Sequence, residues 1–217
     1  MWHSRPRLWT ARSGTVAPDA RGVTHPLSAV SNVAVEVKMW TQPPSAVQYP
    51  AVPYDPRMDK PHAMRVLDAH KIPYTTKVYD TSGDFHPGAE AAALIGADPA
   101  TVYKTLVVLR DNGPRTKPIL VMVPVESEVD LKTLAASLGE KKLRMAKQRE
   151  AEELTGMQVG GISALGLKQP ARFEVLLDES ARDLAKIHVS AGALGVDVEL
   201  AVEDLVKVTG ARWARTR

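Results

Sequence analysis

From residue 61 onward, apolar and polar positions recur with the spacings of helices and strands. Amphipathic or Ala-rich stretches predict helices over residues 61–70, 88–95, 130–138, 148–154 and 202–208. Apolar, β-branched runs predict strands over residues 74–79, 102–110, 119–125, 143–145, 173–177, 186–189 and 196–200. Asp130 and Gly139 are typical of the two ends of a helix, and the sequence Asp-Asn-Gly-Pro at 111–114 predicts a hairpin turn. Because helices and strands do not alternate regularly, we expect an α+β domain with a mixed, largely antiparallel sheet.

Residues 1–60 lack these patterns. They contain eight of the 16 prolines and only two Leu or Ile residues. A segment with so little to bury cannot offset its chain entropy, so we expect it to be disordered. Two other interpretations stay open, namely translation that starts at Met58 or Met64 and a transit peptide, which the Arg-rich opening resembles. We therefore divide the chain into a Pro-rich tail or mis-assigned start, residues 1–60, and a folded domain, residues 61–217.

The composition excludes several classes of protein. Hydrophobic residues make up 44% of the 217 residues and charged residues 24%, which are ordinary values for a globular protein. No apolar run reaches the roughly 18 residues that a membrane span needs. Because the chain has no cysteine, it has no disulfide, no Cys-ligated zinc and no thiol nucleophile, and the zinc-dependent nucleobase deaminases are excluded. Nothing requires an oxidising compartment, so the cytoplasm is the default location.

The net charge of +3 comes from the first part of the chain. Residues 1–60 hold seven of the 28 basic and four of the 25 acidic residues, which leaves 21 of each in the domain. A nucleic acid would therefore be bound by a local patch and not by a general positive field. The candidate basic patch consists of Lys141, Lys142, Arg144, Lys147 and Arg149, with Arg212, Arg215 and Arg217 near the end. A solvated charged face would have the same pattern.

A lysine interrupts the apolar strand V-Y-K-T-L at residues 102–106. Strand alternation places Lys104 on the same face as Val102 and Leu106. If this face is covered, the ammonium group must be paired or must open into a cleft. A strand-end lysine that extends to solvent fits the pattern as well.

Two adjacent glycines, Gly160 and Gly161, form a second candidate. Such a pair lets the backbone come close to a ligand and present N–H groups to an oxyanion or a phosphate. The spacing is neither that of a P-loop nor that of a dinucleotide-binding fingerprint. A plain tight turn or bulge would also explain it.

The third candidate segment covers residues 189–200. Ser190, Gly192 and Gly195 predict a loop between two strands, and Asp197 opens the second strand, where it is suited to hold a substrate amine or a water. His188 shares a strand face with Ser190, so the spacing permits a Ser–His pair. No G-x-S-x-G elbow supports such a nucleophile.

These three segments, taken in order and at these separations, resemble the YbaK family of bacterial Cys-tRNA(Pro) deacylases. That family is related to the editing insertion of prolyl-tRNA synthetase, and the resemblance covers residues 61–210. It implies a single α+β domain around a mixed, barrel-like sheet, with no metal or other cofactor. The implied partner is the acceptor end of an aminoacyl-tRNA, with prolyl-tRNA synthetase open as a second partner, and neither a membrane nor DNA is expected.

The resemblance also implies the site. Its implicated catalytic residues fall on Lys104, Gly160, Gly161 and Asp197. Its substrate-binding residues fall on Tyr79, Phe85, Thr105, Ile162, Ser163, Ser190 and Gly192. The chain departs from the family in the length of the loop 83–88, and it has Ala164 and Ala191 where the family commonly has proline and glycine. Both replacements affect the expected width of the pocket and hence its amino-acid preference.

The implied activity is removal of a mischarged amino acid, above all cysteine from Cys-tRNA(Pro), in translation quality control. Since no protein nucleophile is evident, the family's substrate-assisted route fits: the cysteinyl thiol attacks its own ester and a thiolactone is released, which makes the enzyme a lyase as much as a hydrolase. Two alternatives stay open. One is a non-catalytic regulatory protein on the same fold, and the other is a general RNA-binding module, which the neutral domain and the small number of aromatic residues disfavour.

Overall fold

The computed structural model describes residues 59–81, 88–111 and 116–217, and all of these belong to one compact unit. Residues 1–58 of the tail predicted for 1–60, the candidate Phe85 and most of the predicted hairpin turn lie outside the described residues. The expectations made for them stay predictions.

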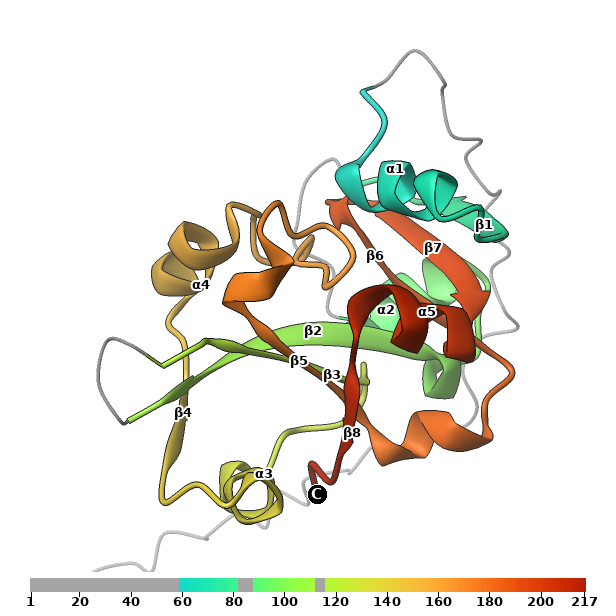
Figure 1. Ribbon diagram of the computed structural model, residues 1–217. Coiled ribbons are helices and arrows are strands. Elements are labelled where there is room, and N and C mark those ends of the chain that lie inside the picture. Colours follow the sequence, from blue (N-terminus) through green and yellow to red (C-terminus); the bar gives the residue numbers. More distant parts are fainter. Residues whose placement is uncertain (1–58, 82–87, 112–115) are drawn as a thin grey trace, which may run out of the picture. The chain divides into compact units, whose positions relative to one another are not determined.

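Eight strands of the described residues form one mixed sheet (Figure 1). The strands are β1 (Tyr74–Val78), β2 (Val102–Arg110), β3 (Ile119–Pro124), β4 (Leu143–Met145), β5 (Glu174–Asp178), β6 (Lys186–Ala193), β7 (Val196–Ala201) and β8 (Arg212–Ala214). Their order is β1-β7-β6-β2-β3-β5-β8, and β4 pairs with β2 outside this path. The pairs β1–β7, β6–β7, β2–β3 and β2–β4 are antiparallel, whereas β2–β6, β3–β5 and β5–β8 are parallel. The predicted α+β fold with a mixed, largely antiparallel sheet is confirmed.

Five α-helices accompany the sheet in the described residues. They are α1 (His62–Ala69), α2 (Gly88–Leu94), α3 (Leu131–Leu138), α4 (Gln148–Thr155) and α5 (Val202–Thr209), and short 3₁₀ turns lie at 99–101, 170–172 and 179–183. The two predicted caps of α3 are confirmed, because the Asp130 carboxylate accepts the Lys132 N–H at 2.8 Å and Gly139 has a left-handed φ of 69°. The strand β8 was not predicted, since only its last residue, Ala214, is fully buried and three residues show no alternation.

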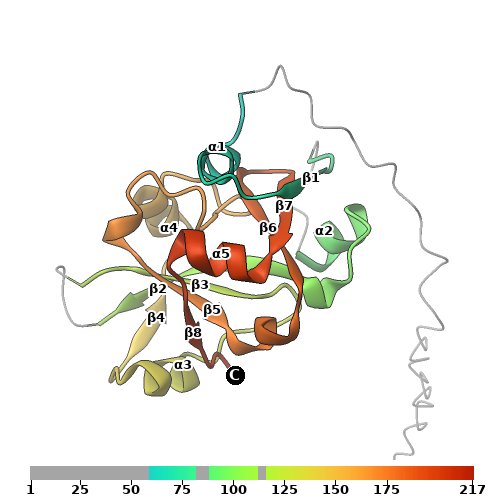
Figure 2. The ribbon, with the colours of Figure 1, turned by 45° about the vertical axis from the view of Figure 1, so that its right-hand side comes forward.

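Strand β3 is apolar throughout because both of its faces are covered. Leu120 and Met122 belong to the main core, to which α1 and α5 contribute, whereas Ile119, Val121 and Val123 pack in a second cluster with residues of α3. Figure 2 shows α5 across one side of the sheet and α3 beside β4 and β8. The continuous apolar run is thus the pattern of a strand buried on both faces.

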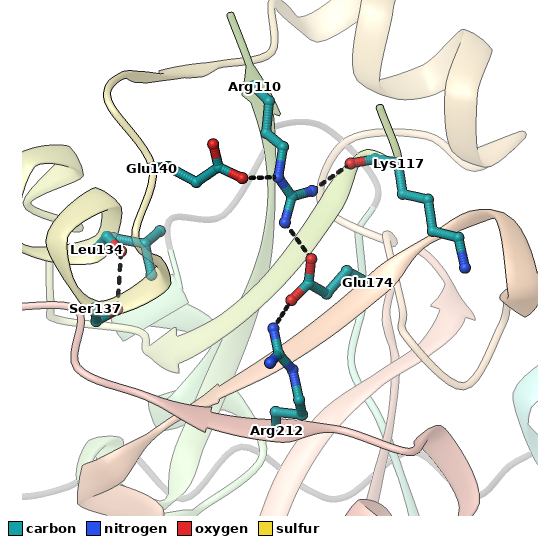
Figure 3. Close-up of polar contacts among 7 residues, drawn as sticks. All are labelled: Arg110, Lys117, Leu134, Ser137, Glu140, Glu174 and Arg212. Atoms are coloured by element: carbon teal, nitrogen blue, oxygen red, sulfur yellow. Dashed lines mark hydrogen bonds and ion pairs between the residues drawn. The ribbon is translucent and has the colours of Figure 1, made fainter. Parts of the chain in front are cut away.

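A polar cluster closes the far end of β2 (Figure 3). The Arg110 guanidinium donates to Glu140 at 2.6 Å and to the Lys117 carbonyl at 2.7 Å, and it also binds Glu174. Glu174 in turn binds Arg212 of β8. The Arg110 side chain is only 12% exposed and both carboxylates are 19% exposed, so these ion pairs are largely shielded from water. These ion pairs join four parts of the fold, namely strand β2, the loop that connects α3 to β4, strand β5 and strand β8.

Candidate active site

Strand β2 changes its partner along one edge. Its start pairs with β6 as far as Tyr103, and its end pairs with β4 from Val108 onward. Between them, residues 104–107 face no strand of the described residues on this edge. After β4, the main-chain N–H of Ala146 donates to the Val107 carbonyl at 2.9 Å, which shows that the peptide groups of Val107 point into the interruption. Because the direction of the peptide groups alternates along a strand, those of Thr105 point the same way. The Thr105 main chain is therefore open to a ligand.

A cavity of about 330 Å³ lies at this interruption. Of the predicted site residues, seven line it: Tyr79, Lys104, Thr105, Gly160, Ile162, Ser190 and Asp197. Most of the remaining wall is apolar and comes from Ala91, Val102, Leu106, Val107, Val125, Met145, Ala146, Ala151 and Val159. Segments separated by more than a hundred residues in sequence thus meet around one pocket of the size that holds small ligands.

Lys104 is half-buried at the pocket wall. Its ammonium group donates a hydrogen bond of 2.9 Å to the carbonyl of Val125, which is itself buried. An ammonium group has three donors, so this bond orients the side chain and leaves two N–H groups for a substrate. Lys104 therefore opens into a cleft and does not extend along the strand to solvent.

Asp197 places a carboxylate inside the same pocket. Its residue is 7% exposed and lies opposite Ser190 of β6 and Lys77 of β1. Within the described part of the chain, no group forms a hydrogen bond or ion pair with this carboxylate, and burial raises its pKa to about 6. A buried carboxylate without a partner is stabilised by a cationic ligand, which makes it suited to an amine.

Tyr79 lies beside Asp197 because Gly195 permits it. The Tyr79 N–H donates to the Gly195 carbonyl at 3.0 Å, and Gly195 has a φ of 72°. A Cβ atom at Gly195 would lie 2.6 Å from the Tyr79 carbonyl oxygen, so only glycine fits this turn. Burial, and then the charge of Asp197, raise the pKa of the Tyr79 hydroxyl, which keeps it protonated and able to donate.

The two adjacent glycines differ in what they do. Gly160 lines the pocket with a φ of 93°, and neither its N–H nor that of Ile162 has an acceptor in the described residues. Gly161 instead donates its N–H to the Gln158 carbonyl at 2.9 Å and packs against the β6–β7 turn, where a Cβ atom would lie 3.0 Å from main-chain atoms. The Gly161 N–H is therefore already used within the loop, and the oxyanion role expected for Gly161 stays a prediction. Its absent side chain lets the loop approach β6.

Three further predicted residues do not line the pocket or cannot be placed there. Ser163 is 1% exposed, and its hydroxyl has no hydrogen-bond partner among the residues that the structure describes. Gly192 lies within β6, which continues to Ala193 with an irregularity after Ser190, so the predicted loop at these residues is wrong. A bulge absorbs the extra residues without ending the strand, and the turn follows at 194–195. Phe85 lies outside the described residues.

The structure shows no hydrogen bond between Ser190 and His188, which the alternative of a Ser–His pair would require. The two ring nitrogens of His188 lie near the Thr101 hydroxyl, at 3.4 Å, and the Glu199 carboxylate, at 3.6 Å. The Ser190 hydroxyl accepts the Gly192 N–H at 3.3 Å. Burial lowers the pKa of His188 despite the nearby carboxylate. No group of three or more His, Asp or Glu in the described residues is arranged to hold a metal ion.

Sequence reasoning missed most of the apolar wall. Ala91 of α2, Val125 after β3 and Ala151 of α4 look like ordinary core residues in the sequence, and only the tertiary arrangement separates them from the core. The described helices include none that is long and apolar enough to cross a membrane.

An α+β sheet whose interrupted edge gathers a lysine, free main-chain N–H groups and a buried carboxylate has the features of an acyl-ester binding site. The family model of the aminoacyl-tRNA editing domain matches residues 86–208, which run from the start of α2 nearly to the end of α5. The chain belongs to the aminoacyl-tRNA editing domain family, as the sequence resemblance predicted.

Two sequence relatives support this assignment. An Enterococcus faecalis protein named "Putative Cys-tRNA(Pro)/Cys-tRNA(Cys) deacylase EbsC" is 35% identical over 155 residues, which cover 71% of this chain and 92% of that protein. A proline–tRNA ligase of Limosilactobacillus fermentum is 29% identical over 112 residues, 49% of this chain and 19% of the ligase.

Solved structures agree with the sequence relatives. The crystal structure of hypothetical protein APE2540 has a TM-score of 0.62 with 25% identity, over 71% of this chain and 98% of that one. The crystal structure of "a putative trans-editing enzyme for prolyl tRNA synthetase" has a TM-score of 0.59 with 25% identity, over 72% and 97%.

Proposed function

We propose that residues 61–217 form a deacylase that removes cysteine from mischarged Cys-tRNA(Pro) in trans, in the cytoplasm, during translation quality control. The observation that carries this proposal is the meeting of Lys104, the Gly160 loop and Asp197 around one pocket in a member of the editing family. The acceptor end of the tRNA is the substrate, and prolyl-tRNA synthetase is the enzyme whose errors it corrects.

Asp197 binds the α-amino group of the aminoacyl ester. The ammonium form of the substrate supplies the positive charge that this buried carboxylate lacks in the described residues. Tyr79 lines the same pocket, and its protonated hydroxyl is available to donate to the substrate. The short cysteinyl side chain then lies against the apolar wall, which excludes water from the ester.

Lys104 and main-chain N–H groups stabilise the charge that develops on the ester carbonyl. The bond to the Val125 carbonyl holds the ammonium group in place, so its remaining donors need little reorganisation as the reaction proceeds. The N–H groups of Gly160 and Thr105 are additional donors at the same wall. Charge stabilisation by fixed donors in a water-poor site is the largest contribution that such a pocket can make.

The bond-breaking step uses the substrate's own thiol. The sulfur attacks the ester carbonyl carbon, the C–S bond forms, the C–O bond to the ribose breaks, and the thiol proton passes to the ribose oxygen. The products are an uncharged tRNA and a thiolactone, which water opens to cysteine. The chain contributes orientation and charge stabilisation, which accounts for a site without a protein nucleophile.

A deacylation assay with cysteinyl-, alanyl- and prolyl-tRNA tests the proposal. Cysteinyl-tRNA should be cleaved fastest, and Lys104→Ala should lower its rate about 100-fold or more, since loss of one such donor costs about 2.7–4 kcal/mol. Lys207→Ala on the exposed side of α5 removes the same charge and should leave the rate unchanged.

Cysteinyl-tRNA with an alkylated thiol separates the routes. If this substrate is cleaved at the normal rate, the thiol is not the nucleophile, and attack by water or by the ribose 2′-OH takes its place in the mechanism. If no ester is cleaved faster than in buffer, the enzyme assignment fails, and tRNA binding without turnover would then support the non-catalytic alternative.

A further inference from the structure

Most of the basic patch expected from the sequence is engaged within the protein. Arg144 binds Glu150 through both terminal nitrogens at 2.7 Å, Arg149 binds Glu153 at 2.8 Å, and Lys142 lies 3.2 Å from an aspartate. An ion pair already formed offers less to an incoming phosphate, because the carboxylate must be displaced or repels it. These side chains therefore do not make a strong phosphate site.

The basic residues at the end of the chain are engaged as well. Arg212 binds Glu174, Arg217 binds the Ser127 hydroxyl, and the Arg215 guanidinium donates to the Arg217 carbonyl at 3.2 Å. None of the three lines the pocket. Among the described residues, the lysines of the candidate patch without an ion pair are thus Lys141 and Lys147.

Lys147 is the cation of this patch whose two neighbours in the chain line the pocket, although it does not itself line the cavity. It lies between Ala146 and Gln148, both of which line the cavity, and its side chain is exposed. Its ammonium group forms no ion pair with any described residue. Glu150, the acid of the same turn, is held by Arg144. An exposed ammonium group without an ion pair among the described residues, next in the chain to residues of the pocket wall, is available to a phosphate.

Met145 adds an apolar surface at the same rim. It is 38% exposed, and Leu194 is the one other large apolar side chain of the described residues that is exposed. Met145 also lines the cavity, so apolar surface continues from the pocket wall to the outside. Exposed apolar surface beside a polar rim is typical of a binding site, and the flat face of a nucleobase is a suitable occupant.

We infer that residues 145–148, which we call the rim strip, bind the terminal nucleotide of the RNA whose ester occupies the pocket. The base packs on Met145, and the phosphate on the 5′ side of that nucleoside binds the ammonium group of Lys147. This inference rests on the proposed function, because the ester in the pocket fixes which nucleotide lies at the rim. In the terminal nucleoside, base and 5′ phosphate are attached to the ribose that carries the ester, so both emerge beside the pocket mouth.

Three substrates of decreasing size test the rim strip: cysteinyl-tRNA, 3′-O-cysteinyl-adenosine, which has no phosphate, and cysteine methyl ester, which has no nucleoside. Lys147→Ala should raise the KM for cysteinyl-tRNA about 5-fold at 0.1 M salt and lower the salt slope by about 0.7, the values for one phosphate contact on a single strand. It should leave the KM for cysteinyl-adenosine unchanged. Met145→Ala should lower the preference for cysteinyl-adenosine over the methyl ester.

Lys141→Ala is the matched control. Lys141 belongs to the same cluster and is exposed without an ion pair among the described residues, but it precedes β4 and does not border the cavity. Its replacement should change no KM by more than about 2-fold, the scale of a distant surface charge. An equal loss for Lys141→Ala and Lys147→Ala, or a loss with cysteinyl-adenosine in Lys147→Ala, overturns the inference.

Binding of a short single-stranded RNA that ends in C-C-A, followed by fluorescence anisotropy, separates this inference from the proposed function. If the wild type cleaves none of the three esters, the proposed function fails. The rim strip is then judged by binding alone, where Lys147→Ala should still weaken the complex relative to Lys141→Ala. Equal dissociation constants for the two variants would refute the proposed role of the rim strip in RNA binding.

Discussion

Replacing Asp197 with asparagine removes a carboxylate whose pKa is raised by burial from 3.8 to about 6. Each pKa unit corresponds to about 1.4 kcal/mol, so ionising this group costs about 3 kcal/mol more in the folded than in the unfolded chain. Because the folded state binds the proton more tightly, the wild type loses this stability as the pH rises from about 4 to about 6 and stays at the lower level above. Asparagine has no such loss.

The expected result is a pH-dependent gain in stability for Asp197→Asn. The difference in unfolding free energy between variant and wild type should grow by about 1.4 kcal/mol from pH 5 to pH 8, while any cost of the buried amide is the same at both values and cancels. Urea unfolding at the two pH values measures it. Asp183→Asn removes an exposed carboxylate and should change stability by less than about 0.5 kcal/mol. A difference that is equal at pH 5 and pH 8 would show that the Asp197 carboxylate is not desolvated.

The same group should appear in the pH dependence of activity. If the ionised Asp197 binds the substrate's ammonium group, kcat/KM for cysteinyl-tRNA should fall as the pH drops below about 6, because protonation removes the charge. Asp197→Asn should have low activity at every pH, and its kcat/KM should show no such fall below about pH 6. The variant would then be more stable and less active, which is the trade-off expected where a site keeps a group that the fold alone disfavours.

Other expected outcomes concern stability alone. Arg110→Ala leaves the shielded carboxylates of Glu140 and Glu174 without that partner and should cost about 2–4 kcal/mol in urea unfolding, whereas Arg149→Ala, in an ion pair with side chains 91% and 64% exposed, should cost less than about 0.5 kcal/mol. Similar losses for both arginines would contradict the role of shielding. Ser163→Ala removes a hydroxyl that is buried without a partner and should leave the thermal midpoint unchanged or raised, and a drop of several degrees would mean that the hydroxyl is hydrogen-bonded.

The elements whose signals are local could be predicted from the sequence. The caps of α3 depend on residues within the helix and one position beyond it, and the alternation of Val196, Val198 and Leu200 marks their buried face directly. Strand β8 depends on a partner far away in the sequence, and the continuation of β6 to Ala193 depends on an irregular register with β7 that no local pattern marks. Glycines near position 192 favour a loop, and only the pairing with β7 makes them part of a strand.

The site shows the same division. Alternation and the family resemblance indicated Lys104 and Asp197, because a charged residue in an apolar strand is visible in one sequence. The acceptor for Lys104, the carbonyl of Val125, is a main-chain atom and has no sequence signal. Nor does the sequence reveal that the Gly161 N–H is used by Gln158, since turn hydrogen bonds depend on the path of the loop.

The interruption along β2, where residues 104–107 pair with neither β6 nor β4, has a consequence for how mutations can alter the pocket. Peptide groups survive every amino-acid replacement that preserves strand register, so the part of the pocket that they form is insulated from mutation. Discrimination between one aminoacyl group and another then falls to the apolar side chains that other elements contribute to the wall, such as Ala91, Val125 and Ala151. Replacing those three side chains, with β2 left unchanged, is therefore expected to alter which aminoacyl group the pocket accepts.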